Sequence, residues 1–219
     1  MKKIYIILLI SFIFSNNYSD KYYSSMDSAL EIFNFSETEE DYLKASNYFF
    51  RISQVIKSDW ISSYYYALCN TRISMFQDDI DIKEIYLDKA FEIIIPFENN
   101  DKNLLDSLVQ SEIHALKAMI YVGKIFINPM INGMKYGSLA SKSIEKSIKL
   151  FSRNPRPYLL DGQSKYYTPA AFGGGVDKAI PLLEKSIQYY NEFQADEYWP
   201  DWGKEDCQDL YEKALSEKE

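Results

Sequence analysis

Hydrophobic residues recur at helical spacing along most of this chain. Apolar positions three and four residues apart form one-sided patterns, and clusters of Pro, Asn, Asp and Gly separate them. The pattern predicts helices over residues 21–33, 39–57, 60–76, 82–97, 104–127, 134–151 and 202–217, and two more within 154–191. The helix over 104–127 is apolar on most of its circumference, which predicts the most buried helix. We therefore expect an all-α protein.

The stretch from 154 to 191 is the clearest single unit. Pro155 and Pro157 open its first helix, and Val176 opens its second after a turn at 169–175. The three glycines of this turn lack the following Lys-Ser/Thr of a phosphate-binding loop. We expect a tight turn between helices, in which glycine supplies positive φ angles.

One spacing recurs along the second helix of each pair. A small residue is followed by a large one four positions later and by a third buried candidate after seven, which places all three on one helix face. The four sets are Ala45, Phe49, Ile52; Ala90, Ile94, Phe97; Ala140, Ile144, Ser147; and Ala179, Leu183, Ser186. This repetition predicts stacked helix pairs.

The repeat resembles that of the tetratricopeptide repeat family, most clearly at Gly162, Ala179, Leu183 and Ser186, with Pro155 closing the preceding unit. The alanines lie 45, 50 and 39 residues apart, whereas the family period is about 34. The resemblance implies a right-handed α-solenoid of degenerate tetratricopeptide-like helix pairs.

Two further resemblances concern function. Uncharacterised secreted repeat proteins of Bacteroidetes type are similar in the runs ALEIF, YFFRISQVIKSDWISSYYYAL, NPRPYLLDGQSKYYTPAAFGGGVDKAIPLLEKS and WPDWG. The segment AFGGGVDKA resembles the repeat component of tripartite ATP-independent transporters, over some thirty residues. The first group implies no assigned activity, and the second implies a binding role in transport.

The first residues have the layout of a secretory signal peptide. Lys2 and Lys3 precede an apolar run that ends at Phe14, which is shorter than the roughly 20 residues of a transmembrane helix. We expect a signal peptide over residues 1–18, a single helical-repeat domain over 19–219, and a periplasmic or secreted protein, with an uncleaved anchor as the alternative. In such a compartment Cys69 and Cys207 are either bonded or separately buried thiols.

Charge is distributed unevenly along the chain. The formal net charge of −8 argues against nucleic-acid binding by the whole surface. Residues 20–106 contain 8 basic and 17 acidic side chains, residues 117–178 contain 10 and 3, and residues 184–219 contain 4 and 11. A basic middle section therefore lies between two acidic ones.

Few residues suggest catalysis or metal binding. His114 is the single histidine, and the chain contains neither an HExxH nor a G-x-S-x-G motif. Asp78, Asp79 and Asp81 resemble half a calcium loop, but the required Gly and terminal Glu are missing. We expect no enzyme activity, no metal site and no cofactor, although sites made of carboxylates alone stay open.

Two groups of residues are candidates for binding. Aromatic side chains beyond what a repeat core needs could bind a peptide or partner helix, although most could also be core. The binding candidates are Trp60, Tyr64, Tyr65, Tyr166, Tyr167 and Phe172, from an aromatic set that also contains Tyr66, Trp199 and Trp202. The second group is a basic stripe of Lys135, Lys142, Lys146, Lys149 and Arg153, which is either a solvated face or a site for an acidic partner.

These features favour a protein–protein interaction scaffold in the cell envelope that binds a protein or peptide. The alternative is a small-ligand-binding accessory protein of a transport system, with the ligand enclosed between helices near the glycine turn. A scaffold predicts an open groove with exposed aromatic residues, whereas a ligand carrier predicts a pocket.

Overall fold

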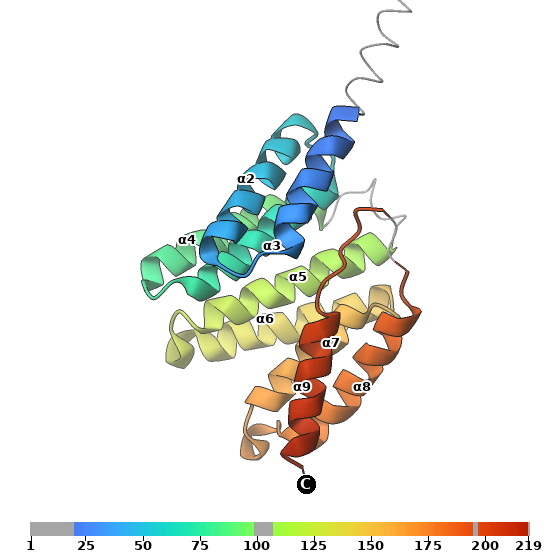
Figure 1. The fold of residues 1–219 in the computed structure, drawn as a ribbon. Helices are drawn as coiled ribbons and strands as arrows, with labels where there is room; N and C mark the ends of the chain where they lie inside the picture. The colour runs from blue at the N-terminus through green and yellow to red at the C-terminus, as the bar shows by residue number, and fades with distance from the viewer. Residues whose placement is uncertain (1–19, 99–106, 195–196, 219) are drawn as a thin grey trace, which may run out of the picture.

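The structure is a computed structural model that describes residues 20–98, 107–194 and 197–218. Within these ranges all regular structure is helical, which confirms the predicted all-α class (Figure 1). The N-terminal helix covers residues 20–34. It is followed by α2 (Glu39–Val55), α3 (Trp60–Phe76), α4 (Ile80–Ile94), η1 (Ile95–Phe97), α5 (Ser107–Ile125), α6 (Pro129–Leu150), α7 (Pro155–Tyr167), η2 (Ala170–Phe172), α8 (Val176–Glu192) and α9 (Lys204–Ser216).

Consecutive helices pack side by side, and α5 lies at the centre. It contacts α3 and α4 on one side and α6 and α7 on the other. Of the 19 residues in α5, 13 are buried, more than in any other described helix, which confirms the prediction for this segment. The N-terminal helix with α2, α3 and α4 forms one end of the molecule, and α7, α8 and α9 form the other (Figure 1).

The repeated spacing has the expected structural meaning. All twelve residues of the four sets are buried, from Ala45 in α2 to Ser186 in α8. Helices of a pair also approach closely at glycines, since a Cβ added at Gly162 would lie 2.7 Å from a methyl carbon of Leu183. The pairing is thus confirmed, while the solenoid handedness and the tetratricopeptide relationship stay predictions.

One helix begins earlier than its pattern predicts. Asn128 caps α6 by accepting a hydrogen bond from the Ile131 amide, and Pro129 occupies the first helical position. Proline fits there because the first amides of a helix have no intrahelical partner. The expected start at Met134 was therefore wrong, and residues 129–133 belong to the helix.

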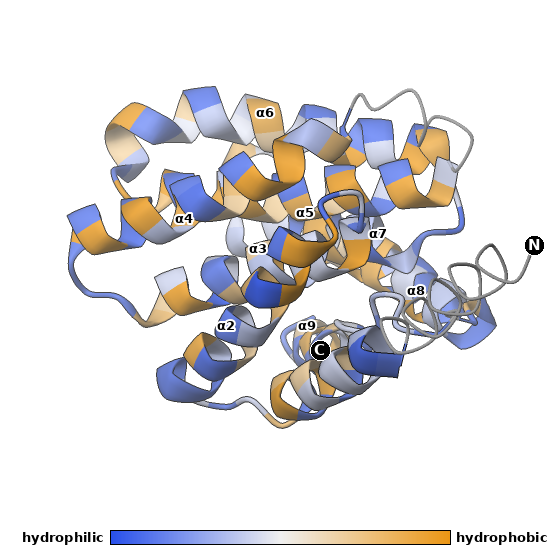
Figure 2. Ribbon diagram, turned by 90° about the horizontal axis from the view of Figure 1, so that it is seen from above, coloured by the Kyte–Doolittle hydropathy of each residue, from blue (hydrophilic) through white to orange (hydrophobic). Residues whose placement is uncertain are grey.

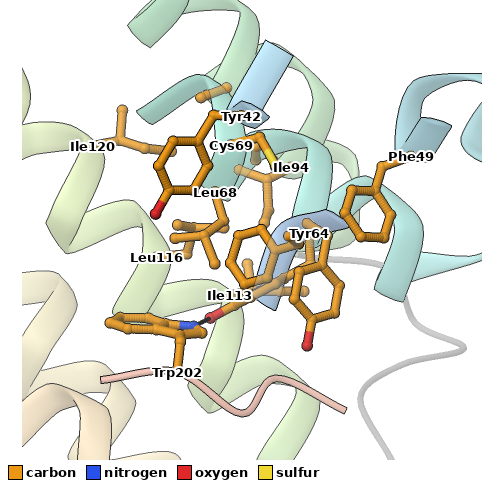
Figure 3. Packing of buried hydrophobic residues seen from close by; sticks show 14 of the residues in the cluster. Tyr42, Phe49, Tyr64, Leu68, Cys69, Ile94, Ile113, Leu116, Ile120 and Trp202 are labelled. Atoms are coloured by element: carbon orange, nitrogen blue, oxygen red, sulfur yellow. Dashed lines mark hydrogen bonds between the residues drawn. The ribbon is translucent and has the colours of Figure 1, made fainter. Parts of the chain in front are cut away.

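A single large apolar cluster joins most of the helices. Aromatic rings dominate its N-terminal half, where Phe33, Phe49 and Tyr65 contact one another at centroid distances of 4.9 to 6.4 Å. Figure 2 shows hydrophobic and hydrophilic residues alternating along the helices, and Figure 3 shows Tyr64 and Trp202 beside the aliphatic core. Both Cys69 and Cys207 are buried and free.

The predicted signal peptide and the start of the predicted domain at residue 19 lie outside the described residues. Among the helices that the structure describes, none is long and apolar enough to cross a membrane.

Candidate functional site

The structure separates the aromatic candidates into two groups. Tyr64 and Tyr65 are buried in the core, and Trp60 is half-buried and packs edge-to-face on Trp199. Tyr167 and Phe172 are exposed beside the turn after α7. In the same region the hydroxyl of Tyr166, the remaining candidate, donates to Glu217. The six candidates therefore do not form one surface.

The turn itself is a connection between helices. Gly173 and Gly175 have φ angles of 88° and 98°, which are left-handed values that favour glycine. The amide of Gly175 donates to the Lys165 carbonyl at 2.8 Å, which closes the turn. Neither of the two cavities described below borders these glycines.

The basic stripe is exposed and lies apart from the aromatic candidates. Lys142, Lys146 and Lys149 are solvent-exposed on α6. Arg153, just beyond the helix, forms an ion pair with Glu192 of α8. The stripe is thus a surface feature that the fold leaves available.

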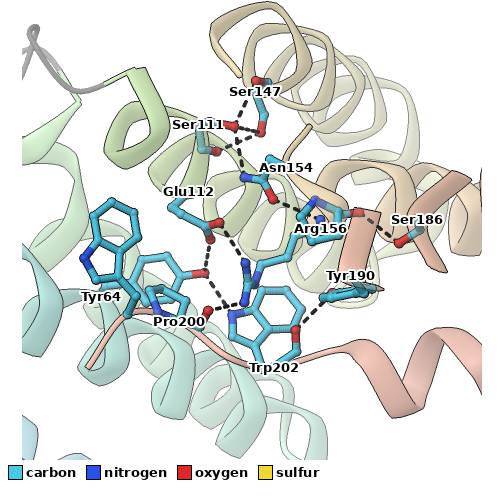
Figure 4. A network of polar contacts seen from close by, with 12 residues as sticks. Tyr64, Ser111, Glu112, Ser147, Asn154, Arg156, Ser186, Tyr190, Pro200 and Trp202 are labelled. Carbon is cyan, nitrogen blue, oxygen red and sulfur yellow. Dashed lines mark hydrogen bonds and ion pairs between the residues drawn. The ribbon is translucent and has the colours of Figure 1, made fainter. Parts of the chain in front are cut away.

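A buried polar network missed by sequence reasoning connects α3, α5 and α7 (Figure 4). Arg156 and Glu112 are both fully buried, and Arg156 Nη1 donates to Glu112 Oε1 at 2.8 Å. The hydroxyl of Tyr64 donates to the other oxygen of Glu112 at 3.1 Å and accepts from the Trp202 indole at 2.9 Å. Burial raises the pKa of Glu112, and the Arg156 guanidinium and the Tyr64 hydroxyl offset part of that rise.

The same network holds the segment that precedes α9. The carbonyl of Pro200 accepts from Arg156, and that of Trp199 accepts from Tyr65. The Trp202 carbonyl accepts from the Tyr190 hydroxyl at 2.9 Å. Three carbonyls of this segment, those of Trp199, Pro200 and Trp202, are thus hydrogen-bonded to side chains from the core, which positions the chain that leads into α9.

That segment forms one wall of a cleft, which we call the terminal cleft because it joins the first and the last helices that the structure describes. Its volume is about 430 Å³, within the range of small-ligand sites. The opposite wall comes from the turn after the N-terminal helix and from α2 and α3. The lining residues are Phe33, Asn34, Ser36, Tyr42, Arg72, Asp201, Trp202, Gly203, Lys204, Glu205 and Asp206.

The terminal cleft combines an aromatic floor with a charged rim. Phe33, Tyr42 and Trp202 are mostly buried and form the floor, and the half-exposed ring of Phe76 packs against Tyr42. Arg72 lies in the wall, where its Nη1 donates to the Tyr42 hydroxyl at 3.3 Å. Such a site suits a flat, apolar molecule that carries an acidic group.

The cleft lining contains two cationic and three acidic side chains. Arg72 lies 3.6 Å from the Asp206 carboxylate, and its Nε is buried without a hydrogen-bond partner among the described residues. The first turn of α9 has no side-chain cap, so the amide end of the helix attracts anions. Lys204 adds a positive charge, whereas Asp201 and Glu205 oppose an acidic ligand.

A second, smaller cavity of about 270 Å³ lies between the N-terminal helix and the end of α2. It is lined by Tyr22, Ile52 and Ile56, with Lys21 and Arg51 among its other residues. Its volume lies just below the range of about 300–1,000 Å³ that is usual for small-ligand sites.

Among the residues that the structure describes, no three His, Cys, Asp or Glu side chains converge on a point where they could hold a metal ion. His114 is buried in α5, and neither ring nitrogen has a hydrogen-bond partner there. Burial lowers the pKa of His114 to about 4, and Lys146 and Lys117 add to this effect against the opposing Glu98 carboxylate. This neutral, enclosed imidazole does not border the terminal cleft.

Comparison with known proteins gives one solved structure that is similar throughout. The HusA haemophore from Porphyromonas gingivalis matches with a TM-score of 0.77 and 29% sequence identity, over 90% of this chain and 94% of that chain. The likeness agrees with a helical protein of Bacteroidetes type. No protein-family model matches the chain, and no curated protein matches it.

Proposed function

We propose that this protein binds haem or a related tetrapyrrole outside the cytoplasm, and that the terminal cleft is the binding site. The observation that carries the proposal is the similarity to a haemophore over nearly the whole length of both chains. The signal-peptide pattern at residues 1–18 agrees with an envelope or secreted location. Binding without catalysis is part of this proposal.

The chemistry of the cleft fits such a ligand. A tetrapyrrole is a flat aromatic ring with carboxylates on one edge, and aromatic side chains stack on or pack edge-to-face against such rings. Phe33, Tyr42 and Trp202 would contact the ring with the small part of each side chain that borders the cleft. Arg72 and Lys204 would hold the carboxylates, because guanidinium and ammonium groups form charge-assisted hydrogen bonds with them.

The residues present favour recognition of the ring over recognition of its iron. Histidine is a common haem ligand, but the single histidine, His114, is buried away from the cleft. Tyr42 has the one phenol oxygen in the cleft lining, and that oxygen already accepts from Arg72. We therefore expect haemin and iron-free protoporphyrin IX to bind with affinities within about tenfold of each other.

A ligand carboxylate must compete with Asp206 for Arg72. Substitutions of these two residues should therefore change the affinity in opposite directions. Arg72→Gln should weaken binding about tenfold or more, because a charge-assisted hydrogen bond contributes about 1.5–3 kcal/mol. Asp206→Asn should strengthen it several-fold by freeing the guanidinium. Trp202 lies in the cleft wall, and Trp60 contacts Trp199 nearby, so quenching of tryptophan fluorescence measures the affinity.

Arg51→Gln, in the smaller cavity, is the matched control and should bind like the wild type. The proposed site is wrong if both cleft variants bind like the wild type. The proposed function is wrong if neither tetrapyrrole quenches the fluorescence of the wild-type protein at micromolar concentration.

A further inference from the structure

The first turns of α6 expose large apolar side chains. Met130, Ile131 and Met134 are 96%, 73% and 89% exposed, and Phe126 in the preceding turn is 65% exposed. Single apolar residues are ordinary on protein surfaces, whereas a contiguous group of this size marks an interaction site. We call these four residues the apolar tip.

The rest of the same helix face is basic. At 100° per residue, Ile131, Lys142 and Lys149 project within about 20° of one another. Lys135 and Lys146 lie about 40° and 60° to one side of Ile131, and Glu145, the single acidic residue of α6, lies about 40° to the other side. The opposite face packs on α5 through buried side chains such as Ile144.

The lysines of this face are not used for folding. Among the described residues, Lys142, Lys146 and Lys149 form no ion pair within 4 Å. Lys135 lies over the ring of its neighbour Tyr136, with its Nζ 4.7 Å from the centroid. These lysines form a positive region on a protein whose formal net charge is −8.

We propose that this face of α6 docks on an anionic lipid surface, with the apolar tip inserted among the lipids and the lysines above the headgroups. A helix with an apolar portion and a lysine-rich polar portion lies in a membrane interface in this way. Each lysine near an anionic surface adds about fivefold to the affinity. The acidic remainder of the protein is repelled by the same surface, which orients α6 toward it.

Two features favour lipid over a folded protein partner. The apolar tip belongs to α6 and the turn before it, at the outer side of the molecule in Figure 2, and none of its residues lines either cavity. The positive charges in the helix are all lysines, which suit a diffuse layer of headgroups, whereas arginine suits fixed carboxylates. The face does not border the terminal cleft, so the inference is independent of tetrapyrrole binding.

Vesicle flotation tests the proposal with the signal-free chain. We expect the protein to float with vesicles of equal parts phosphatidylglycerol and phosphatidylcholine, and about tenfold or more less with phosphatidylcholine alone. Ile131→Ser/Met134→Ser and Lys142→Gln/Lys146→Gln/Lys149→Gln should each reduce flotation at least tenfold. These residues are exposed, so both variants should keep the thermal stability of the wild type.

Two matched controls change equal numbers of exposed residues elsewhere. Ile82→Ser/Ile85→Ser lies on α4, and Lys44→Gln/Lys57→Gln/Lys89→Gln removes the same charge; both should float like the wild type. Equal flotation of the two α6 variants and their controls would overturn the proposal. The proposal would also be overturned if the wild-type protein did not float with anionic vesicles but bound soluble poly-glutamate, because the face would then be a docking site for acidic protein.

Discussion

Arg156 is a fully buried cation that is shared by three parts of the chain. It bonds Glu112 of α5 and the Pro200 carbonyl, and its guanidinium carbon lies 5.3 Å from the centre of the Trp202 ring. Removing two charges from water costs free energy that only good geometry and extra hydrogen bonds recover. The residue therefore orders the segment before α9 more than it stabilises the fold.

This view predicts a non-additive mutational cycle. Glu112→Gln or Arg156→Met alone should lower the free energy of unfolding by about 3–5 kcal/mol, because each leaves a buried polar group unpaired. The free energy of unfolding of the double variant should fall by less than the sum of the two single-variant losses. Urea unfolding of the four proteins measures the coupling, and strictly additive losses would show that the pair does not act as a unit.

His114 predicts a pH dependence of stability. Its pKa is about 4 in the folded protein, mainly because of burial, and about 6.5 when unfolded. Between these values the unfolded chain binds more protons, so the free energy of unfolding falls as the pH falls. Below pH 4 the loss reaches about 3 kcal/mol.

Comparing wild type with His114→Leu by urea unfolding at pH 7 and pH 4 isolates this contribution from that of the carboxylates. The wild type should lose about 3 kcal/mol more than the variant over this interval. Equal losses would mean that the buried imidazole becomes protonated without cost.

At the scale of the helices, the local sequence was sufficient to predict the buried face wherever burial depends only on the spacing of apolar residues. The alanine-based sets predicted which faces are buried because small and large residues must alternate where two helices meet. The expected start of α6 at residue 134 was too late because a helix can begin at a proline, and Pro129 occupies the first helical position. That error hid the apolar tip, since Met130 and Ile131 were assigned to a loop.

The terminal cleft could not be predicted in the same way. It joins Phe33, Tyr42 and Arg72 to residues 201–206, which lie more than a hundred positions away. No periodic pattern encodes such a contact. Trp202 was recognised as part of an unusual aromatic set, but the buried pair of Glu112 and Arg156 that supports its position leaves no local signature.

Gly203, the residue before α9, gives a prediction at this scale. Its φ is 94°, and an added Cβ would lie 2.9 Å from Leu159 and still closer to the Tyr190 hydroxyl. Gly203→Ala should therefore lower the free energy of unfolding by about 2–4 kcal/mol and weaken tetrapyrrole binding by moving the cleft wall.

Gly133→Ala is the control, because Gly133 lies in α6 with open space around its Cα. It should raise the free energy of unfolding by about 1 kcal/mol, since alanine favours helices. Urea unfolding of both variants distinguishes the two effects. Equal behaviour would mean that the backbone before α9 tolerates a side chain.

At the scale of the whole molecule, the N-terminal helix and the segment around the start of α9 meet. Tyr198 donates to Asp27 of the N-terminal helix at 2.8 Å, and Arg72 of α3 faces Asp206 of α9. A ligand in the terminal cleft therefore touches the first and last parts of the fold at once. Binding there should hold the ends together.

Thermal unfolding with iron-free protoporphyrin IX checks this consequence. A ligand at one hundred times its dissociation constant adds about 2.7 kcal/mol to the stability of the folded state. For a protein of this size, the melting temperature should rise by about 5–10 °C. Arg72→Gln at the same ligand concentration should show a much smaller rise, and an equal rise would place the ligand elsewhere.

The two free thiols lie at different depths of this closed arrangement. Cys69 is buried in α3 within the main core, whereas Cys207 is on α9 with its sulfur 3.6 Å from the Leu183 carbonyl. Undocking of the last helix exposes the second thiol but leaves the first covered. The rate at which a thiol reagent modifies Cys207 therefore reports partial opening of the fold, and the rate for Cys69 reports global unfolding.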